Sequence, residues 1–244
     1  MRIEFEDQFD SEDLDASRWL AYYLPQWSSR EQARARYEVG GGLLRLVIEE
    51  DQQPWCPEFD GDVRVSSLQT GVFAGPVGST VGQHRFNQNA VVREAQETLR
   101  LYTPQYRHVE VRAKAPDDPR TMVALWMIGF EDQPERSGEI CVCEIFGRDV
   151  TADSAGVGVG IHPFGDPALV DDFTTVRVAI DAREFHVYAA DWTPDGVAYY
   201  VDGQLVKRTQ QSPAYSMQLM LNIYEFERGG DYPKVFEVDY VRAG

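Results

Sequence analysis

Short runs in which apolar and polar residues alternate recur along most of the chain. Alternation with period two, rich in β-branched and aromatic residues, predicts half-buried β-strands. Turn-forming Gly, Pro, Asp and Asn separate these runs, and TPDGVAYYVDGQLV (193–206) predicts a hairpin region with turns at 194–196 and 202–203. The clearest strand candidates are LLRLVIEE (43–50), HVEVRAKA (108–115), MVALWMIGF (122–130), EFHVYAADW (184–192), VAYYVDG (197–203) and KVFEVDYVR (234–242).

Two segments depart from this pattern. REQARARY (30–37) is a short helical candidate that the glycines at 40–42 would end. Residues 51–98 have the weakest pattern and predict long loops at one end of the fold, where binding sites often collect. No linker or internal repeat divides the chain, so we expect one all-β domain over 1–244, a β-sandwich jelly roll of two antiparallel sheets.

The charge balance limits the class of partner. The chain has 23 basic and 40 acidic residues, a net charge of −17, which repels phosphate backbones and argues against a nucleic-acid partner. No stretch approaches the ~20 apolar residues that span a bilayer, so no membrane partner is expected. The acidic opening MRIEFEDQFDSEDLD lacks the apolar segment of a signal peptide. We expect a monomer, and the sequence assigns no compartment.

The chain has three cysteines, Cys56, Cys141 and Cys143. This odd number supports no disulfide framework, and their spacing matches no metal motif. In a regular strand, Cys141 and Cys143 point to the same face but are poorly placed to bridge each other. No metal site and no cofactor is predicted, although a structural calcium stays open.

The segment SGEICVCEIFG (137–147) carries the most chemical information. Glu139 and Glu144 lie five positions apart, and a regular strand would place them on opposite faces. A single β-bulge between them would bring both to one face, and bulges are frequent beside active sites. Two carboxylates about 5–5.5 Å apart suit retaining glycoside hydrolysis. From spacing alone, two ordinary surface glutamates remain the simpler interpretation.

This segment resembles the active-site strand of glycoside hydrolase family 16, whose pattern is Glu-x-Asp-x-x-Glu. Further segments resemble the family in the same order along the chain: YRHVEVRAK (106–114), ALWMIG (124–129), FHVYAADWTPDGVAYYVDGQLV (185–206) and FEVDYVRAG (236–244). The resemblance implies a concanavalin-like jelly roll, with Glu139 as nucleophile and Glu144 as acid/base. Cys141 stands where the family has Asp, which puts the catalytic rate in doubt more than the reaction type.

Other candidate residues follow from the resemblance and from side-chain chemistry. Trp126 precedes the motif strand and is a candidate for stacking on a sugar ring. His162, Asn222 and Tyr224 match positions that border the family's cleft. Trp27 and Arg30 are candidates for a rim subsite. Trp192 and His186 are expected to be structural, and Glu225 and Glu227 are discounted as rival catalytic acids.

The leading hypothesis is a retaining endo-β-glycosidase that hydrolyses O-glycosidic bonds in a polysaccharide. The default substrate is a β-1,3- or mixed β-1,3/1,4-glucan. One alternative is a carbohydrate-binding, lectin-like module whose catalysis lapsed with Cys141. Another is a transglycosylase, which passes the glycosyl group to a second sugar instead of water.

Overall fold

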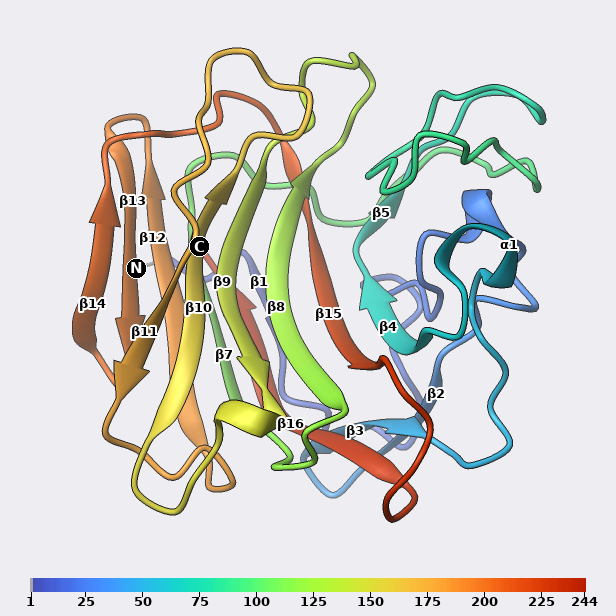
Figure 1. Ribbon diagram of the computed structural model, residues 1–244. Coiled ribbons are helices and arrows are strands. Elements are labelled where there is room, and N and C mark those ends of the chain that lie inside the picture. Colours follow the sequence, from blue (N-terminus) through green and yellow to red (C-terminus); the bar gives the residue numbers. More distant parts are fainter. Residues whose placement is uncertain (1) are drawn as a thin grey trace.

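Two large antiparallel sheets stacked face to face form the body of the protein (Figure 1). The computed structural model describes residues 2–244. One sheet has the order β11-β10-β9-β8-β15-β4, and the other has the order β14-β13-β12-β7-β16-β3-β2, with β1 paired to β16. Loops from residues 17–35 and 51–98, with α1 and the small β5–β6 pair, form a lobe beside β4 and β15 (Figure 1). This two-sheet sandwich confirms the predicted fold class.

The strands of the first sheet and of the small pair are β4 (Arg64–Gln69), β5 (Gly71–Val72), β6 (Leu99–Arg100), β8 (Thr121–Gly129), β9 (Glu139–Phe146), β10 (Ala155–His162), β11 (Thr174–Val178) and β15 (Met217–Glu225). The strands of the second sheet are β1 (Phe5–Asp7), β2 (Arg36–Gly40), β3 (Leu43–Ile48), β7 (His108–Lys114), β12 (His186–Thr193), β13 (Gly196–Val201), β14 (Gln204–Thr209) and β16 (Lys234–Ala243). The short helices are η1 (Pro25–Trp27), α1 (Pro57–Asp60) and η2 (Gly147–Asp149).

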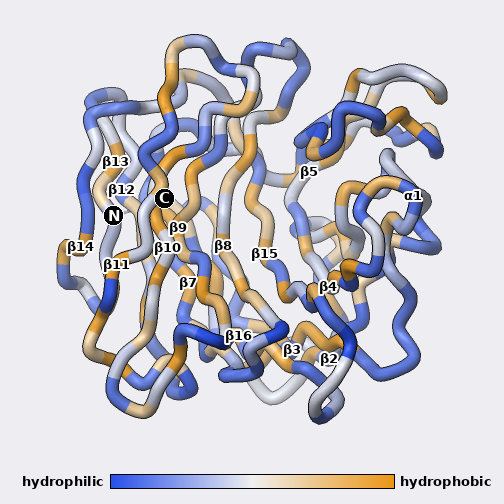
Figure 2. Tube along the Cα trace, in the orientation of Figure 1, coloured by the Kyte–Doolittle hydropathy of each residue, from blue (hydrophilic) through white to orange (hydrophobic). Residues whose placement is uncertain are grey.

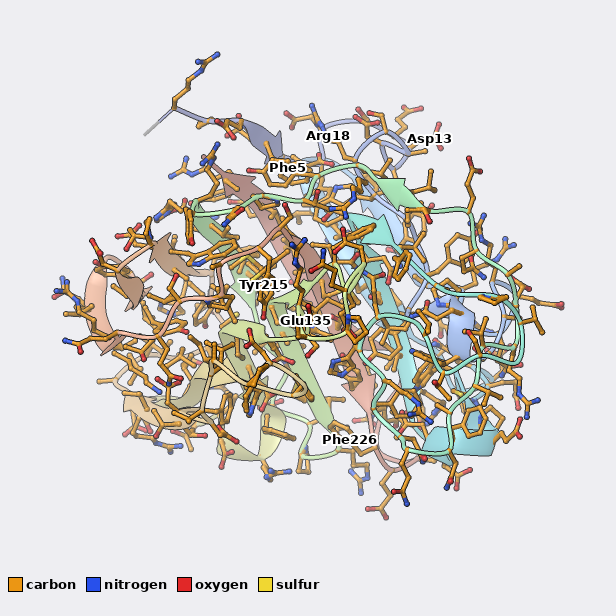
Figure 3. All side chains as sticks on the ribbon, turned by 90° about the horizontal axis from the view of Figure 1, so that it is seen from above. Phe5, Asp13, Arg18, Glu135, Tyr215 and Phe226 are labelled. Atoms are coloured by element: carbon orange, nitrogen blue, oxygen red, sulfur yellow. The ribbon has the colours of Figure 1, made fainter. Side chains whose placement is uncertain are left out.

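The main hydrophobic core fills the space between the two sheets. Alternate residues of the strands point into it, as a sandwich requires. Figure 2 shows the apolar segments concentrated in the strands and the polar segments in many of the connecting loops. Seen along the strands, side chains fill the whole interval between the sheets (Figure 3).

A second core covers part of the outer face of the first sheet. Trp27, Trp55 and Val92 of the lobe pack with residues of β4, β8 and β15, among them Trp126 and Tyr224. The lobe therefore covers one half of the sheet and leaves the β9–β10 half open. A binding site at this boundary has one wall from the sheet and one wall from the lobe.

Most local predictions are confirmed, and two are wrong, because the loops predicted over 51–98 include the strand β4 and one predicted helix is absent. Each quoted strand candidate forms a strand, and the predicted hairpin turns join β12 to β13 and β13 to β14. Asp202 and Gly203 both have positive φ, as the tight second turn requires. The helix expected at 30–37 does not form: residues 31–33 are a turn and Arg36 begins β2. Eight residues have too few internal hydrogen bonds to hold a helix against strand pairing with β3.

Candidate active site

The motif strand β9 contains the bulge that the spacing of its glutamates requires. Against β8, Leu125 pairs with Cys143 and the next residue, Trp126, pairs with Cys141. Val142 is therefore the extra residue of the strand. The pairing with β10 shows the same irregularity, since Gly158 opposes Glu144 and Gly160 opposes Cys141.

The bulge changes which side chains face outward. Val142 and Cys143 are consecutive, yet both lie in the core between the sheets. Glu139, Cys141 and Glu144 all line one cavity on the outer face. The expectation that Cys141 and Cys143 share a face is wrong, because the inserted residue shifts the alternation by one position. All three cysteines are buried and free.

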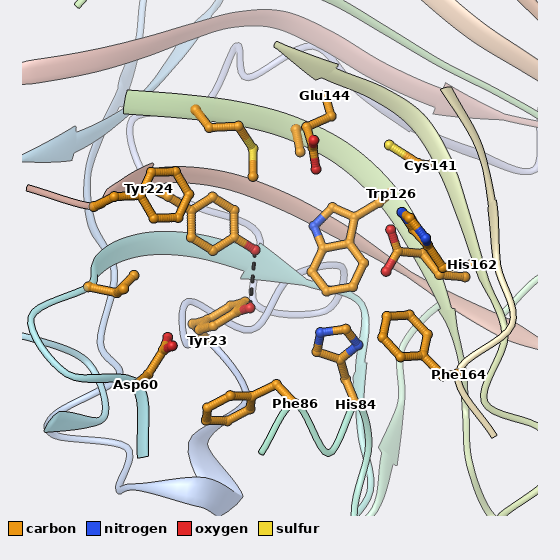
Figure 4. Close-up of a pocket in the computed structure, with 15 residues that line it drawn as sticks. Tyr23, Asp60, His84, Phe86, Trp126, Cys141, Glu144, His162, Phe164 and Tyr224 are labelled. Carbon is orange, nitrogen blue, oxygen red and sulfur yellow. Dashed lines mark hydrogen bonds between the residues drawn. The ribbon is translucent and has the colours of Figure 1, made fainter. Parts of the chain in front are cut away.

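The cavity has a volume of about 420 Å³ and lies at the boundary between the sheet and the lobe. The sheet contributes Trp126 and Tyr224 beside the two glutamates, and Figure 4 shows Trp126 between the β9 residues and His84 of the lobe. The remaining lining is largely aromatic: Tyr23, Phe86, His162, Phe164 and Phe226. Aromatic faces beside paired carboxyls suit a ligand with apolar faces and polar edges, as a sugar ring has.

The two carboxyls lie in different environments. Glu139 is only 7% exposed, and burial raises its pKa well above the usual range, with the charge of Glu144 adding to the effect. Burial also raises the pKa of Glu144, against the opposing charge of Arg148. Burial therefore shifts both carboxyls toward their protonated forms, and Glu139 is the more buried of the two.

Cys141 lies between the two glutamates in the strand and is almost fully buried. Its Sγ donates a weak hydrogen bond to the carbonyl of Gly158, 3.6 Å away. Burial, reinforced by the charges of Glu144 and Glu139, raises the pKa of the thiol well above its usual range. Cys141 is therefore a neutral thiol.

Trp126 lines the cavity, but it is also part of the second core and only 4% exposed. Its indole N–H donates to Oδ1 of Asn222, 2.5 Å away. Asn222 is fully buried, and its Nδ2 has no hydrogen-bond partner among residues 2–244. The prediction that Asn222 contacts sugar is wrong, because its side chain is completely buried; it accepts the indole N–H of Trp126 instead.

His162 and Tyr224 line the cavity, where the sequence analysis placed them. His162 Nδ1 lies 3.4 Å from a carboxylate oxygen of Asp171. The hydroxyl of Tyr224 donates to that of Tyr23 across the cavity, 3.1 Å away (Figure 4).

The rim subsite expected at Trp27 is wrong, whereas the part of it expected at Arg30 stays a prediction. Trp27 is fully buried in the second core and donates its indole N–H to the carbonyl of Gln83. Arg30 bonds to Gln96 and does not line the cavity. Trp27 therefore stabilises the lobe, because its loops need a core of their own.

Several lining residues escaped the sequence analysis because they come from irregular segments. His84 and Phe86 lie in GQHRFNQNA, Tyr23 precedes η1, and Phe164 follows β10. For His84 and Phe86 the only signal was the weak pattern of residues 51–98, which located the loops without selecting residues, and Tyr23 and Phe164 had no such signal.

The other acidic candidates are accounted for. Glu225 is fully buried and forms an ion pair with Arg64, and the Tyr232 hydroxyl donates to it. Glu227 is exposed and lies outside the cavity. Trp192 and His186 make structural hydrogen bonds to Ser212 and Asp202.

Among residues 2–244, no group of three or more His, Cys, Asp or Glu side chains is placed to hold a metal ion. No helix in that range is long and apolar enough to cross a bilayer.

An antiparallel sandwich with paired carboxyls in an aromatic hollow on its outer face suits a carbohydrate-active domain. The sequence profile of Glycosyl hydrolases family 16 matches residues 97–241, more than half of the chain. The chain belongs to this family, as its resemblance predicted.

Individual relatives support the same assignment. The chain is 23% identical to the Glucan endo-1,3-beta-glucosidase A1 of Niallia circulans, over 100% of this chain and 38% of the relative. It thus spans well under half of that relative's length.

Among solved structures, a GlcNAcα1-4Gal releasing endo-β-galactosidase from Clostridium perfringens is similar with a TM-score of 0.86 and 31% identity. The similarity covers 99% of this chain and 61% of that one. The laminarinase of Flavobacterium sp. UMI-01 has a TM-score of 0.67 and 18% identity, over 99% of both chains, and shows the shared fold.

Proposed function

We propose that this domain is a retaining endo-β-glycosidase with Glu139 and Glu144 as its catalytic carboxyls. The observation that carries the proposal is the bulge at Val142, which turns both glutamates into one cavity. Without the bulge, the two carboxyls would lie on opposite faces of β9. A bulge that serves only a structural purpose has no need to place a buried and a partly buried carboxyl in one cavity.

The reaction has two steps. A carboxylate oxygen of Glu139 bonds to the anomeric carbon while the bond from that carbon to the leaving oxygen breaks. At the same time, Glu144 donates its proton to the leaving oxygen. Glu144, now a carboxylate, then takes a proton from water as the water oxygen attacks the same carbon and releases Glu139. Two inversions at one carbon retain the anomeric configuration.

The resemblance of the strand to the family motif supports the order of the two roles. Burial raises the pKa of both carboxyls, so their titration does not distinguish the nucleophile from the acid. The reaction needs one proton on the pair. When the sugar is attacked, that proton must be on Glu144, and Glu139 must be ionised. Cys141 cannot share in this exchange, since a neutral thiol is a weak donor and acceptor.

The substrate class is a polymer of β-linked neutral hexoses. Glucan-cleaving relatives favour β-1,3- or mixed β-1,3/1,4-glucan. The likeness to the endo-β-galactosidase of Clostridium perfringens is greater in both identity and TM-score than that to the Flavobacterium laminarinase, and it favours a β-galactoside-containing glycan as the second candidate. A screen of laminarin, lichenan, agarose, carrageenan, xyloglucan and a galactosyl glycoprotein glycan distinguishes them.

Substitution of each carboxyl tests the mechanism. Glu139→Gln removes the nucleophile and should abolish hydrolysis of every substrate. Glu144→Gln should lower polymer hydrolysis by about 10²- to 10⁴-fold, the usual contribution of a general acid. It should retain activity on 2,4-dinitrophenyl glycosides, whose leaving group departs without a proton. Glu227→Gln removes an exposed charge outside the cavity and serves as the matched control.

Three outcomes would contradict the proposal in different ways. Equal loss for Glu144→Gln on polymer and activated glycoside would exclude Glu144 as the acid. Inverted configuration of the first product, measured by proton NMR, would exclude retention. Sugar binding without turnover in the wild-type protein would indicate the lectin-like alternative.

A further inference from the structure

The backbone immediately before Glu139 is held by a buried hydrogen-bonded cluster that has no part in the proposed chemistry. Tyr215, two residues before β15, is 9% exposed, and its hydroxyl accepts the backbone N–H of Gly138, 2.8 Å away. The same hydroxyl donates to Oδ2 of Asp166, 2.7 Å away. Asp166 is 8% exposed and lies in the loop after β10. We call these three residues the Tyr215 clasp, because they join the segments before β9, after β10 and before β15.

Two glycines make room for the tyrosine at the loop end of the β8–β9 hairpin. A Cβ atom on Gly129, the last residue of β8, would lie 3.0 Å from the Tyr215 ring. A Cβ atom on Gly138 would lie 2.6 Å from the Tyr215 hydroxyl and 2.5 Å from Leu169. In Figure 3, Tyr215 lies beside the loop that carries Glu135 and joins the two strands. Glycine at 138 therefore permits the close approach of the hydroxyl to the backbone.

Glu139 is the first residue of β9, so the strand ladder continues on its C-terminal side only. Its register partners lie on β8 and β10. On its N-terminal side, the carbonyl of Gly138 accepts the N–H of Gly129, 3.0 Å away, and the N–H of Gly138 donates to Tyr215. A buried backbone N–H needs a partner, and weakly held segments open locally. The Tyr215 hydroxyl thus closes the end of the strand that carries the nucleophile.

Asp166 fixes the direction of the Tyr215 hydroxyl. Its Oδ1 accepts the backbone N–H of Ala168, 2.8 Å away, which leaves Oδ2 for the tyrosine. Burial, together with the hydrogen bond to Asp166, raises the pKa of the Tyr215 hydroxyl, so the hydroxyl keeps its proton. With that proton on the side of Asp166, a lone pair of the oxygen faces the N–H of Gly138. Removal of the carboxyl would free the hydroxyl to turn away.

The clasp influences the active site through the backbone alone. Neither Tyr215 nor Asp166 lines the active-site cavity, whereas Glu139 does. Attack on the anomeric carbon needs the carboxylate oxygen about 3–3.5 Å from that carbon, and a misplacement of about 1 Å can cost about 10²-fold in rate. A shift of the peptide at Gly138 moves the side chain of the next residue, which is Glu139.

We propose that Tyr215 is a positioning residue for the nucleophile Glu139, acting through the N–H of Gly138 and oriented by Asp166. The proposal rests on the proposed function, because it needs Glu139 as the nucleophile. It applies to a glucan and to a galactoside substrate alike, since the clasp does not line the cavity. Glu144 lies farther along β9, beyond the bulge, so the clasp acts on the first carboxyl of the pair.

Tyr215→Phe removes the hydroxyl and keeps the ring. Its kcat should fall about 10- to 100-fold on polymer and on 2,4-dinitrophenyl glycosides, because both substrates need the attack by Glu139. KM should stay within about threefold of wild type, because the residues that line the cavity are unchanged. Glu144→Gln should differ, since it retains activity on the dinitrophenyl glycosides. Asp166→Ala should also lower kcat, and the double variant should be no slower than Tyr215→Phe, because both changes act on one hydrogen bond.

Tyr188→Phe is the matched control. Tyr188 is 1% exposed in the same core, and its hydroxyl has no hydrogen-bond partner among residues 2–244. Its loss should leave kcat unchanged. Gly138→Ala crowds the Tyr215 hydroxyl and provides a second way to displace it. Melting curves show whether each variant is folded at the assay temperature, and hydrogen exchange by mass spectrometry should be faster in Tyr215→Phe over residues 137–140.

The outcomes separate the clasp from the proposed function. A kcat for Tyr215→Phe within about twofold of an active wild type would overturn the positioning role alone. An equal fall in Tyr188→Phe, or a loss carried by KM alone, would overturn it as well. A loss on polymer with full activity on the dinitrophenyl glycosides would place the effect on Glu144 and overturn the action on Glu139. Absence of hydrolysis by the wild-type protein on every substrate would overturn the enzyme assignment, and the positioning role with it.

Discussion

Trp126→Phe should destabilise the fold more than an ordinary Trp-to-Phe substitution in the core, because the indole N–H of Trp126 has a buried hydrogen-bond partner. Asn222 is fully buried, and Trp126 is the partner of its Oδ1. Phenylalanine would leave both polar atoms of that amide without partners, since Nδ2 already has none. Leaving a buried acceptor unsatisfied costs about 1–3 kcal/mol. The smaller ring adds a cavity term, so we expect about 2–3 kcal/mol in total.

Thermal and urea unfolding measure this loss. An unfolding entropy of ~2.1 cal/mol/K per residue gives about 0.5 kcal/mol/K for a chain of this length, so Tm should fall by about 4–6 °C. The urea midpoint should fall without a change in the m-value. Activity should fall as well, since Trp126 forms a wall of the active-site cavity.

Trp192→Phe is the matched control. Trp192 is equally buried, but its indole N–H donates to Oγ of Ser212, a partly exposed residue that can turn to water. The loss of stability caused by Trp192→Phe should therefore not include the cost of an unsatisfied buried polar group. In the double variant Trp126→Phe/Asn222→Leu, part of the loss should be recovered, with about 1–2 kcal/mol of coupling between the two sites. Equal losses for both tryptophans, together with no coupling, would refute the reasoning.

Three further predictions concern buried charge. Cys141→Asp should raise turnover about 10- to 100-fold, which corresponds to a barrier lower by about 1.4–2.8 kcal/mol, by supplying a carboxyl that exchanges a proton with Glu139. Its Tm should fall at neutral pH because the new charge is buried, and unchanged turnover would contradict the prediction. Glu139→Gln should have a higher Tm than wild type at pH 7, and the difference should vanish below about pH 4, because a carboxyl whose pKa is raised by folding destabilises the fold above its unfolded pKa. Melting curves of both proteins over a series of pH values measure this difference. Glu225→Gln should cost about 3–5 kcal/mol by leaving Arg64 buried without its charge partner, so a Tm shift below 2 °C would show that the pair is dispensable.

The sequence determined the sandwich, because local residue patterns specify strands and turns directly. The alternation in KVFEVDYVR and the glycine of the Asp202–Gly203 turn need no distant contact to indicate β16 and the β13–β14 hairpin. The short candidate at 30–37 failed for the opposite reason. Its composition suits a helix, but pairing with β3 decides the conformation of so short a segment.

The catalytic pair was visible as a spacing, and only the tertiary structure decided its geometry. The bulge at Val142 depends on pairing with β8 and β10, and it sends Cys143 into the core while Cys141 faces the cavity. The roles of Asn222 and Trp27 were likewise settled by burial, which no local pattern reports.

The boundary between the lobe and the loops of the first sheet shows most clearly what the sequence cannot predict. His84, Glu131 and Phe164 are far apart in sequence and lie in irregular segments, so no periodicity connects them. They meet because the second core holds the lobe against one half of the outer face of the sheet. Local sequence therefore specified the strands and the reactive groups, whereas long-range packing decided which side chains surround them.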